Sequence, residues 1–228
     1  MKIGIIGSGI VGQTLGGKLL EVGNEVMISS RDTSRAKDSG RFKLPSVDQW
    51  VKDRRAKGQK ASGGSFRDAA RFGEVVINAT PGKISVEALK TAGRENLKGK
   101  VLVELANPLE FSKTGGMTLT VANSDSLAES IQRAFPEAKV VKALNTVSAP
   151  VMVNPGALKG DHTLFVAGND EAAKRWVEET LIKQWLGWRT VIDLGDLTGA
   201  RGMEMYLHLW IKLLGKLGGP MFNINVVR

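Results

Sequence analysis

Three glycines near the start of the chain have the spacing of a dinucleotide-binding loop. Gly7, Gly9 and Gly12 form a G-x-G-x-x-G pattern directly after an apolar run at residues 2–6. The first glycine allows a tight turn, the second lets a pyrophosphate approach the backbone, and the third lets the next helix pack closely on the strand. That helix also presents free N–H groups to phosphates. In this context the pattern predicts a dinucleotide site, although glycines also form plain structural turns.

The residues that follow the second apolar run favour NADP over NAD. NAD-binding chains usually place Asp or Glu about twenty residues past the glycines, where the carboxylate holds the ribose 2′-hydroxyl. Ser30 stands eighteen residues after Gly12 and is followed by Arg31, and a hydroxyl with a guanidinium suits a 2′-phosphate. Arg35 lies one turn further and can close over the same phosphate. The alternative is a strand that ends two residues later, which would make Asp32 the ribose carboxylate and NAD the cofactor.

The elements that must hold these residues alternate between strands and helices. After strands at residues 2–6 and 25–30, the strand candidates are 74–79, 101–105, 139–144, 163–167 and 190–193. Helices are expected at about 47–56, 65–71, 85–92, 124–134 and 170–185, and residues 39–64 are otherwise less regular. Such alternation predicts a Rossmann-type α/β fold with a doubly wound, mostly parallel sheet. We expect this domain to span residues 1–195 and a C-terminal helix and tail to span residues 196–228.

Three short segments that follow strands are candidates for the wall of a pocket. Ligands of an open parallel sheet bind beyond the carboxyl ends of its strands. The segments at this edge are Thr80-Pro81-Gly82, Ala106-Asn107-Pro108 and Asn145-Thr146-Val147. Pro and Asn also populate turns for their own reasons, but three such segments beside a dinucleotide loop favour one shared site.

The composition excludes several classes of chemistry. The chain of 228 residues contains no cysteine and only two histidines. Disulfides, thiolate metal sites, iron–sulfur clusters and cysteine nucleophiles are therefore excluded, and no metal site is expected. No segment reaches the roughly 18 apolar residues of a membrane span, and the first apolar run is too short for a secretory signal. We expect a cytoplasmic protein that does not bind membranes.

The net charge of +9 is concentrated in one window. Residues 31–60 hold ten Lys or Arg and four Asp, which leaves six excess positive charges. One interpretation is a solvated basic face, and another is attraction of a polyanionic small molecule to a site beside the window. Nucleic acid is disfavoured as a partner because the window has few aromatic side chains on which bases could stack.

Several of these segments together give the chain a family resemblance. It resembles the NADP-dependent oxidoreductases that reduce or oxidise the deazaflavin coenzyme F420, and the related N-terminal reductase domains of the STEAP metalloreductases. The likeness extends over nearly the whole chain and is carried by residues 2–9, 29–31, 78–81, 142–147, 166–170 and 193–201. The Lys-Ala-Leu-Asn-Thr-Val and Ala-Gly-Asn-Asp elements are its most specific parts, because the glycine loop is shared by many dehydrogenases.

The resemblance implies which residues bind the ligands. Those expected to bind the dinucleotide are Gly7, Ser8, Gly9, Ile10, Val11 and Gly12 around the pyrophosphate, Ser30, Arg31 and Arg35 at the 2′-phosphate, and Thr80 and Pro81 beside the nicotinamide. Asn145 and Thr146 would line the space where the second substrate docks, and Asn107 joins the set from the pocket wall. Relatives that use the deazaflavin often carry His where this chain has Asn145, which is a departure from the family pattern.

No Lys or His stands in a recognisable catalytic motif, so we predict no catalytic residue. Reduction of a simple ketone normally needs a proton donor near the carbonyl, and the thirty-five residues after Asp193 leave no room for a helical substrate domain. A flavin or deazaflavin ring accepts a hydride directly. The leading hypothesis is NADPH-dependent hydride transfer to a small planar acceptor, foremost the deazaflavin. The alternatives are a reductase of a flavin or a small carbonyl or imine, and a non-catalytic NADP-binding sensor.

The last helical stretch, at about residues 199–217, is apolar around most of its circumference. Such a helix should be buried on more than one side, and a small monomer has little room for that. We therefore expect a homodimer contact here, with a wholly intramolecular core as the alternative. His208, within this stretch, is expected to be a packed core residue.

Overall fold

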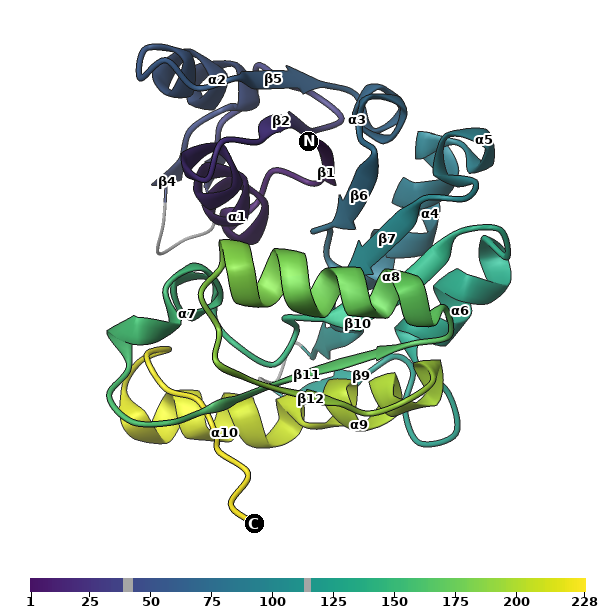
Figure 1. Ribbon diagram of the computed structural model, residues 1–228, viewed down its shortest axis with the longest axis vertical. Helices are drawn as coiled ribbons and strands as arrows, with labels where there is room; N and C mark the ends of the chain where they lie inside the picture. The colour runs from purple at the N-terminus through teal and green to yellow at the C-terminus, as the bar shows by residue number, and fades with distance from the viewer. Residues whose placement is uncertain (39–42, 113–115) are drawn as a thin grey trace.

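An eight-stranded sheet forms the centre of the protein in a computed structural model that describes residues 1–38, 43–112 and 116–228 (Figure 1). Its strands, in spatial order, are β12 (Thr190–Asp193), β11 (Thr163–Gly168), β10 (Lys139–Ala143), β7 (Val101–Glu104), β6 (Val75–Asn78), β1 (Lys2–Ile6), β2 (Glu25–Ser29) and β5 (Ala61–Gly64). From β10 to β5 all neighbours are parallel, and the strand order reverses between β6 and β1, as in doubly wound sheets. The predicted Rossmann-type fold is confirmed.

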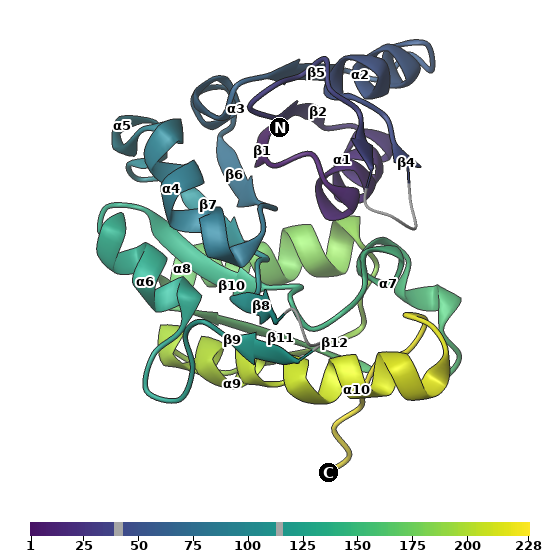
Figure 2. The ribbon, with the colours of Figure 1, turned by 180° about the vertical axis from the view of Figure 1, so that it is seen from behind.

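Helices cover both faces of the sheet and bury an apolar core on each (Figures 1 and 2). One core lies under α1 (Ile10–Glu21), α2 (Val47–Arg55), α7 (Ala149–Val153) and α8 (Glu171–Trp176), which continues as a π-helix at Val177–Trp185. The other lies under α3 (Phe66–Phe72), α4 (Gly82–Ala92), α5 (Arg94–Leu97) and α6 (Leu127–Ala134). Neighbouring strand residues enter opposite cores, as Val76 and Ile77 do, which explains why these strands are apolar throughout.

The direction of the sheet reverses at β11, which is antiparallel to β10 and parallel to β12. We call the end of the sheet formed by the last residues of the six parallel strands the carboxyl edge. Because of the reversal, β12 ends at the opposite edge, and the chain returns through α9 (Ala200–Met205) and α10 (Leu207–Leu217). Leu197 N–H donates to Asn169 Oδ1 just before α9, and Met203 near its end accepts from Asn145 after β10. The C-terminal helices therefore finish at the carboxyl edge.

The predicted strands agree with the structure to within one residue at each end, but three features were not expected. β5 has the sequence Ala-Ser-Gly-Gly, which lacks β-branched residues, and it forms through parallel pairing with β2. Two short hairpins also form, β3 (Lys37–Asp38) with β4 (Lys43–Leu44) and β8 (Leu109–Phe111) with β9 (Met117–Leu119). Part of the stretch expected to be less regular, residues 39–42, lies outside the described residues.

The stretch expected to form one C-terminal helix divides near Tyr206 into α9 and α10. In α10 only Leu207 is buried, and Leu209 and Leu217 are 54% and 59% exposed. His208 is also exposed, so the prediction that it is a packed core residue is wrong, because the described chain covers only part of this helix and leaves the side of His208 open to solvent. Neither α10 nor any other helix within the described ranges has the length and apolar composition needed to cross a bilayer.

Candidate active site

The glycine turn between β1 and α1 leaves an open cradle at its centre. Gly7 has a φ of +116°, a conformation that favours glycine, and a Cβ on Gly12 would lie 2.5 Å from Gly7 O. Gly9 differs, because beyond its two chain neighbours no atom of the described residues lies within 4 Å of a Cβ placed there. The Oγ atom of Ser8 is buried in the same turn without a hydrogen-bond partner in the described chain. This space at the N-terminus of α1 fits an approaching pyrophosphate.

The end of β2 lies beside this turn and carries the residues expected to select the cofactor. Ser29, the last residue of β2, forms a bridge with Gly7, so Ser30 comes directly after the strand. Arg31 is exposed next to it, and Arg35 is exposed four residues further on. Because β2 ends at Ser29, the longer strand required for the NAD alternative does not form.

The carboxylate of Asp32 is engaged within its own loop. Its Oδ1 atom accepts hydrogen bonds from Ser34 N at 3.0 Å and from Ser34 Oγ at 2.7 Å. These hydrogen bonds hold the pKa of Asp32 below its ordinary value. A carboxylate bound in this way is less available to a ribose hydroxyl, so the loop favours a 2′-phosphate beside Arg31.

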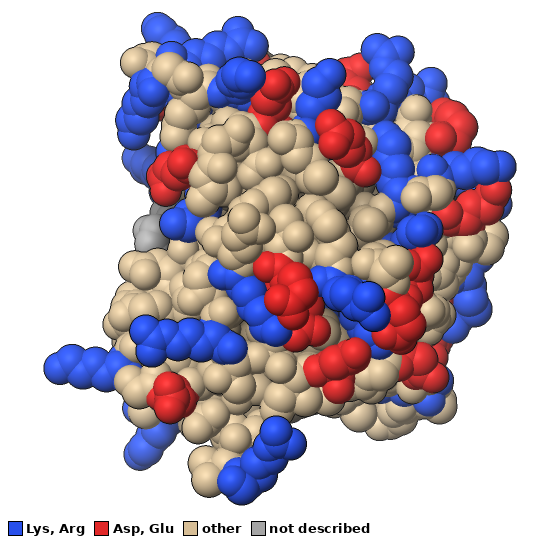
Figure 3. All heavy atoms as spheres, in the orientation of Figure 1, with Lys and Arg blue, Asp and Glu red and all other residues tan. Residues whose placement is uncertain are grey.

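The basic window at residues 31–60 does not converge on this site. Lys60 Nζ lies 3.1 Å from the carboxylate of Glu25, the first residue of β2. Arg54 pairs with Glu21 at the end of α1, at 3.6 Å. Both contacts lie at the edge opposite the glycine turn, and Figure 3 shows Lys and Arg side chains gathered over this α2 end of the molecule. The window is therefore divided between the two edges, because Arg31 and Arg35 follow β2 beside the glycine turn, whereas Lys60 and Arg54 lie at the opposite edge. Residues 39–42 of the window lie outside the described residues.

The polar residues after β6 form a buried network next to the reversal in strand order. Asn78, the last residue of β6, accepts a hydrogen bond from Thr80 Oγ1 at 2.7 Å and donates one to Ser85 Oγ at 3.0 Å. Gly82 allows α4 to begin against the next turn, since a Cβ there would lie 2.1 Å from Asn107 O. Doubly wound sheets bind ligands in the crevice at such a reversal, so Thr80 lies where a ligand is expected.

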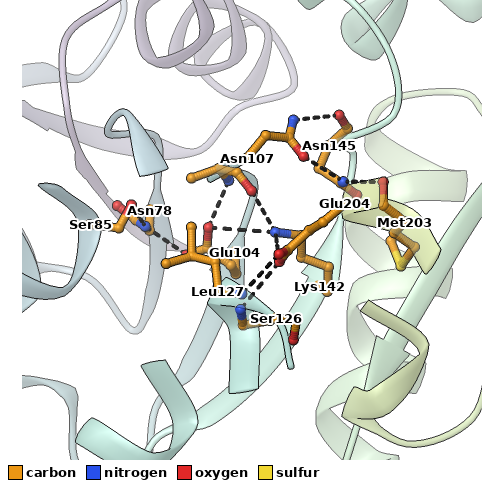
Figure 4. Close-up of polar contacts among 12 residues, drawn as sticks. Asn78, Ser85, Glu104, Asn107, Ser126, Leu127, Lys142, Asn145, Met203 and Glu204 are labelled. Atoms are coloured by element: carbon orange, nitrogen blue, oxygen red, sulfur yellow. Dashed lines mark hydrogen bonds and ion pairs between the residues drawn. The ribbon is translucent and has the colours of Figure 1, made fainter. Parts of the chain in front are cut away.

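A reciprocal pair of amides joins the turns after β7 and β10 (Figure 4). Asn107 Nδ2 donates to Asn145 O at 2.8 Å, and Asn145 Nδ2 donates to Asn107 Oδ1 at 2.9 Å. Asn145 Nδ2 also donates to Met203 O at 3.0 Å, which connects α9 to the pair. Asn145 Oδ1 and Thr146 Oγ1 are buried and have no partner within the described residues. Buried polar atoms are normally hydrogen-bonded, so these two oxygens lack the partner that such atoms usually have.

The turn that presents these oxygens has a strained backbone. Leu144 has a φ of +62° and a fully buried side chain. The left-handed region costs such a residue roughly 1–2 kcal/mol, and strain of this kind persists only where the surroundings determine the conformation. Packing around Leu144 therefore holds Asn145 and Thr146 in one arrangement.

Three charged side chains are buried next to the amide pair (Figure 4). Glu104 at the end of β7 and Lys142 in β10 are 0% exposed, and Glu204 in α9 is 1% exposed. Lys142 Nζ lies 2.7 Å from Glu204 Oε1 and 3.9 Å from Glu104 Oε1. It also donates to Ala106 O at 2.5 Å. We call Glu104, Lys142 and Glu204 the buried charge cluster.

The two carboxylates of the buried charge cluster also accept hydrogen bonds from the surrounding chain. Glu104 accepts from Ala106 N at 2.7 Å and from Asn78 Nδ2 at 2.6 Å. Glu204 accepts from Leu127 N at 2.8 Å and from Ala128 N at 3.3 Å, at the start of α6. Burial raises the pKa of Glu104 to about 7, although the charge of Lys142 opposes this rise. The cluster therefore ties β6, β7, β10, α6 and α9 together.

Comparison with known proteins agrees with this architecture. The family model for NADP oxidoreductases that depend on coenzyme F420 matches residues 2–108. The crystal structure of a candidate F420-dependent NADP reductase from Arthrobacter sp. FB24 is 48% identical, with a TM-score of 0.91, and covers 100% of both chains. This chain belongs to the F420-dependent NADP oxidoreductase family.

Two further relatives are an F420-dependent NADP reductase and a STEAP metalloreductase. The F420-dependent NADP reductase of Methanothermobacter marburgensis is 29% identical over 93% of this chain and 92% of its own length. Metalloreductase STEAP3 of Rattus norvegicus is 29% identical over 89% of this chain, which spans only 36% of that longer protein. The family resemblance recognised in the sequence is therefore confirmed.

The site residues predicted from the sequence lie along the carboxyl edge of the sheet. They comprise the turn at residues 7–12 with Ile10 and Val11 opening α1, the residues after β2, buried Thr80 with exposed Pro81 after β6, and the amide pair with Thr146. The buried charge cluster was not among the residues predicted from the sequence. Its signal was a charged residue within each of two apolar strands, Glu104 in β7 and Lys142 in β10. Glu204 carried no comparable signal.

The raised pKa of Glu104 predicts a pH dependence of stability. The ordinary value is 4.5, whereas in the folded protein it is about 7. Between these values the folded state keeps a proton that the unfolded chain has lost. The stabilisation is thus fully present below about pH 4.5 and is lost as the pH rises through about 7. At roughly 1.4 kcal/mol per pH unit, we expect the free energy of unfolding to fall by at most about 3 kcal/mol.

Urea denaturation across this pH range measures the effect. The Glu104→Gln variant cannot ionise at this position, so its stability should lack this decrease. Glu95→Gln is the control, because Glu95 is exposed on α5, and it should keep the decrease. Parallel pH profiles for Glu104→Gln and the unmodified protein would contradict the assignment.

Proposed function

We propose that this protein transfers a hydride between NADP(H) and the deazaflavin coenzyme F420. The observation that carries the proposal is the presence, along one sheet edge, of the open cradle at Gly9 and the partnerless oxygens of Asn145 and Thr146. The cradle accommodates a pyrophosphate, and the turn that carries the oxygens lies at the same edge, where a second ligand would bind. Identity of 48% over the whole length of a candidate F420-dependent NADP reductase supports this pair of substrates.

On the NADP(H) side, the chain contributes binding and orientation. Ser8, Gly9 and the first N–H groups of α1 hold the pyrophosphate in this proposal, and Ser30, Arg31 and Arg35 hold the 2′-phosphate. Thr80 and Pro81 flank the nicotinamide. NADP(H) supplies the hydride when bound. A charge-assisted contact to the 2′-phosphate fixes the far end of the dinucleotide and so contributes to the alignment of its reactive ring.

On the acceptor side, no protein acid or base takes part in the proposed reaction. His162 has both ring nitrogens engaged, at 3.1 Å from Pro155 O and 3.0 Å from Asn223 Nδ2. His208 is exposed on α10, and the buried charge cluster has no solvent access. In this proposal the turn that carries Asn145 and Thr146 shapes the place where a planar ring docks beside the nicotinamide, and proximity provides the rate enhancement.

Stopped-flow mixing of NADPH with F420, FMN and a cyclic imine tests the proposal. We expect the nicotinamide absorbance to decay fastest with F420. Deuterium placed on the transferring face of the nicotinamide should appear on reduced F420. Decay only with FMN or the imine would reject F420 as the acceptor, and no decay with any member of the panel would support an NADP-binding sensor.

We also propose that α10 and the tail form a homodimer contact outside the Rossmann domain of residues 1–195. The apolar side chains of Leu209 and Leu217 are more than half exposed, and the tail adds Met221, which is 47% exposed. These side chains come from one helix and the tail that follows it, and a contiguous exposed apolar patch typically marks an interaction site. A two-fold contact would cover the same helix in both copies.

Introducing charge on this helix should shift the protein toward monomer. We expect Leu209→Asp and Leu213→Asp to sediment as monomer, or to aggregate, at concentrations where the unmodified protein is a dimer, because a buried charge opposes association. Val22→Asp is the control at an exposed apolar position beyond α1, and it should remain dimeric. Sedimentation of the unmodified protein as a monomer at every concentration would rule out the contact.

A further inference from the structure

The buried charge cluster is placed where it controls the acceptor side of the site. Ala106, whose N–H and C=O are both bound by the cluster, immediately precedes Asn107. Glu204 immediately follows Met203, whose carbonyl accepts a hydrogen bond from Asn145. Asn107 is therefore the next residue after a backbone group that the cluster binds. Asn145 is hydrogen-bonded to the residue that precedes Glu204.

Stability alone does not account for a buried lysine placed beside two buried carboxyl groups. Removing ions from water carries a large desolvation penalty, and well-packed apolar residues often replace a buried ion pair without loss of stability. The contacts of an ionic cluster are directional, unlike those of an apolar core, because each hydrogen bond requires one donor and one acceptor in a defined geometry. Here those directions converge on the turn at residues 104–107 and on the end of α9.

We propose that Glu104, Lys142 and Glu204 act as positioning residues that set the Asn107–Asn145 amide pair and, through it, the place where the acceptor ring docks. The second part rests on the proposed function. Lys142 holds the turn after β7 through Ala106 O and holds α9 through Glu204. Asn145 bridges the same two elements, through Asn107 Oδ1 and Met203 O. A change in the distance between the turn after β7 and α9 would therefore alter the hydrogen bonds of Asn145.

Three variants separate positioning from stability. Glu204→Gln keeps the shape of the side chain and removes its charge. The double variant Lys142→Met with Glu204→Leu replaces the ion pair by apolar groups. Lys174→Met is the control, because Lys174 is also buried and bonded to Glu171 and Asp193, but Asp193 lies at the end of β12, at the opposite edge of the sheet.

Steady-state kinetics with NADPH and F420 provide the first measurement. We expect Glu204→Gln and the double variant to bind NADPH as the unmodified protein does, and to lose about tenfold to a hundredfold in kcat/KM for F420. The double variant should keep this loss even where its melting temperature equals that of the unmodified protein. If the double variant has the melting temperature of the unmodified protein and also its full kcat/KM, the inference is overturned. A purely structural role of the cluster predicts that result. Lys174→Met should keep full kcat/KM.

The side-chain amide signals of Asn107 and Asn145 in nitrogen-15 NMR spectra provide a measurement that needs no acceptor. These signals should shift in Glu204→Gln and in the double variant, and should stay in place in Lys174→Met. Unchanged signals in Glu204→Gln would overturn the inference whether or not F420 is reduced. If the unmodified protein does not reduce F420, the proposed acceptor is rejected. The NMR measurement would still decide whether the cluster positions the amide pair.

Discussion

Replacing Gly9 by alanine is expected to lower the affinity for NADPH by about a hundredfold, which corresponds to about 3 kcal/mol of binding free energy, without lowering the melting temperature. The added Cβ meets no atom of the described chain within 4 Å, so the folded protein should accept it. The same Cβ would occupy the space through which a pyrophosphate reaches the backbone. Isothermal titration calorimetry of NADPH, together with thermal unfolding, measures both effects.

Two other glycines serve as controls for Gly9→Ala. In Gly12→Ala the new Cβ would lie 2.5 Å from Gly7 O, so we expect a loss of stability as well as of binding. In Gly202→Ala the Cβ also meets no described atom within 4 Å, but Gly202 lies on the exposed side of α9, so NADPH affinity should not change. Unchanged NADPH affinity in Gly9→Ala would show that the cradle holds no pyrophosphate.

Replacing Arg31 by alanine is expected to weaken NADPH binding by about tenfold or more and to leave NADH binding nearly unchanged. A charge-assisted hydrogen bond contributes about 1.5–3 kcal/mol, and NADH lacks the phosphate that would accept it. Arg35→Ala should show the same selectivity. The contrast between the two nucleotides matters, because a general disturbance of the turn would weaken both of them.

Lys57→Ala is the matched control for Arg31→Ala. Lys57 belongs to the same basic window and is exposed after α2, at the edge opposite the glycine turn, so its loss should not affect either nucleotide. Fluorescence titration of the three variants with both nucleotides gives the comparison. Equal losses for NADPH and NADH in Arg31→Ala would remove this arginine from the 2′-phosphate site.

The parts of the fold that follow from local pattern could be predicted from the sequence. The apolar run before Gly7, the glycine spacing and the alternation of later strands and helices determine the sheet and the edge where the site lies. β5 escaped prediction because its pairing with β2, rather than the propensity of Ala-Ser-Gly-Gly, makes it a strand. The exposure of His208 and the separation of Lys60 from Arg31 depend on tertiary packing.

The buried charge cluster shows a different limit of prediction. Glu104, Lys142 and Glu204 are separated by 38 and 62 residues in the sequence, and their residue types are common on surfaces. Only the sheet order and the return of α9 bring them within hydrogen-bonding distance. A charged residue in a strand that is otherwise apolar does indicate a buried partner, but it does not identify which distant residue provides it.

The reversed direction of β11 has a consequence for how such a chain can grow during evolution. If β11 and β12 continued the parallel direction, α9 would begin at the carboxyl edge and run away from it. With the reversal, α9 begins at the far edge, near Asn169, and delivers α10 to the side where Asn145 lies. A longer protein built on this sheet can therefore append a new domain after α10 and cover the carboxyl edge without interrupting any strand.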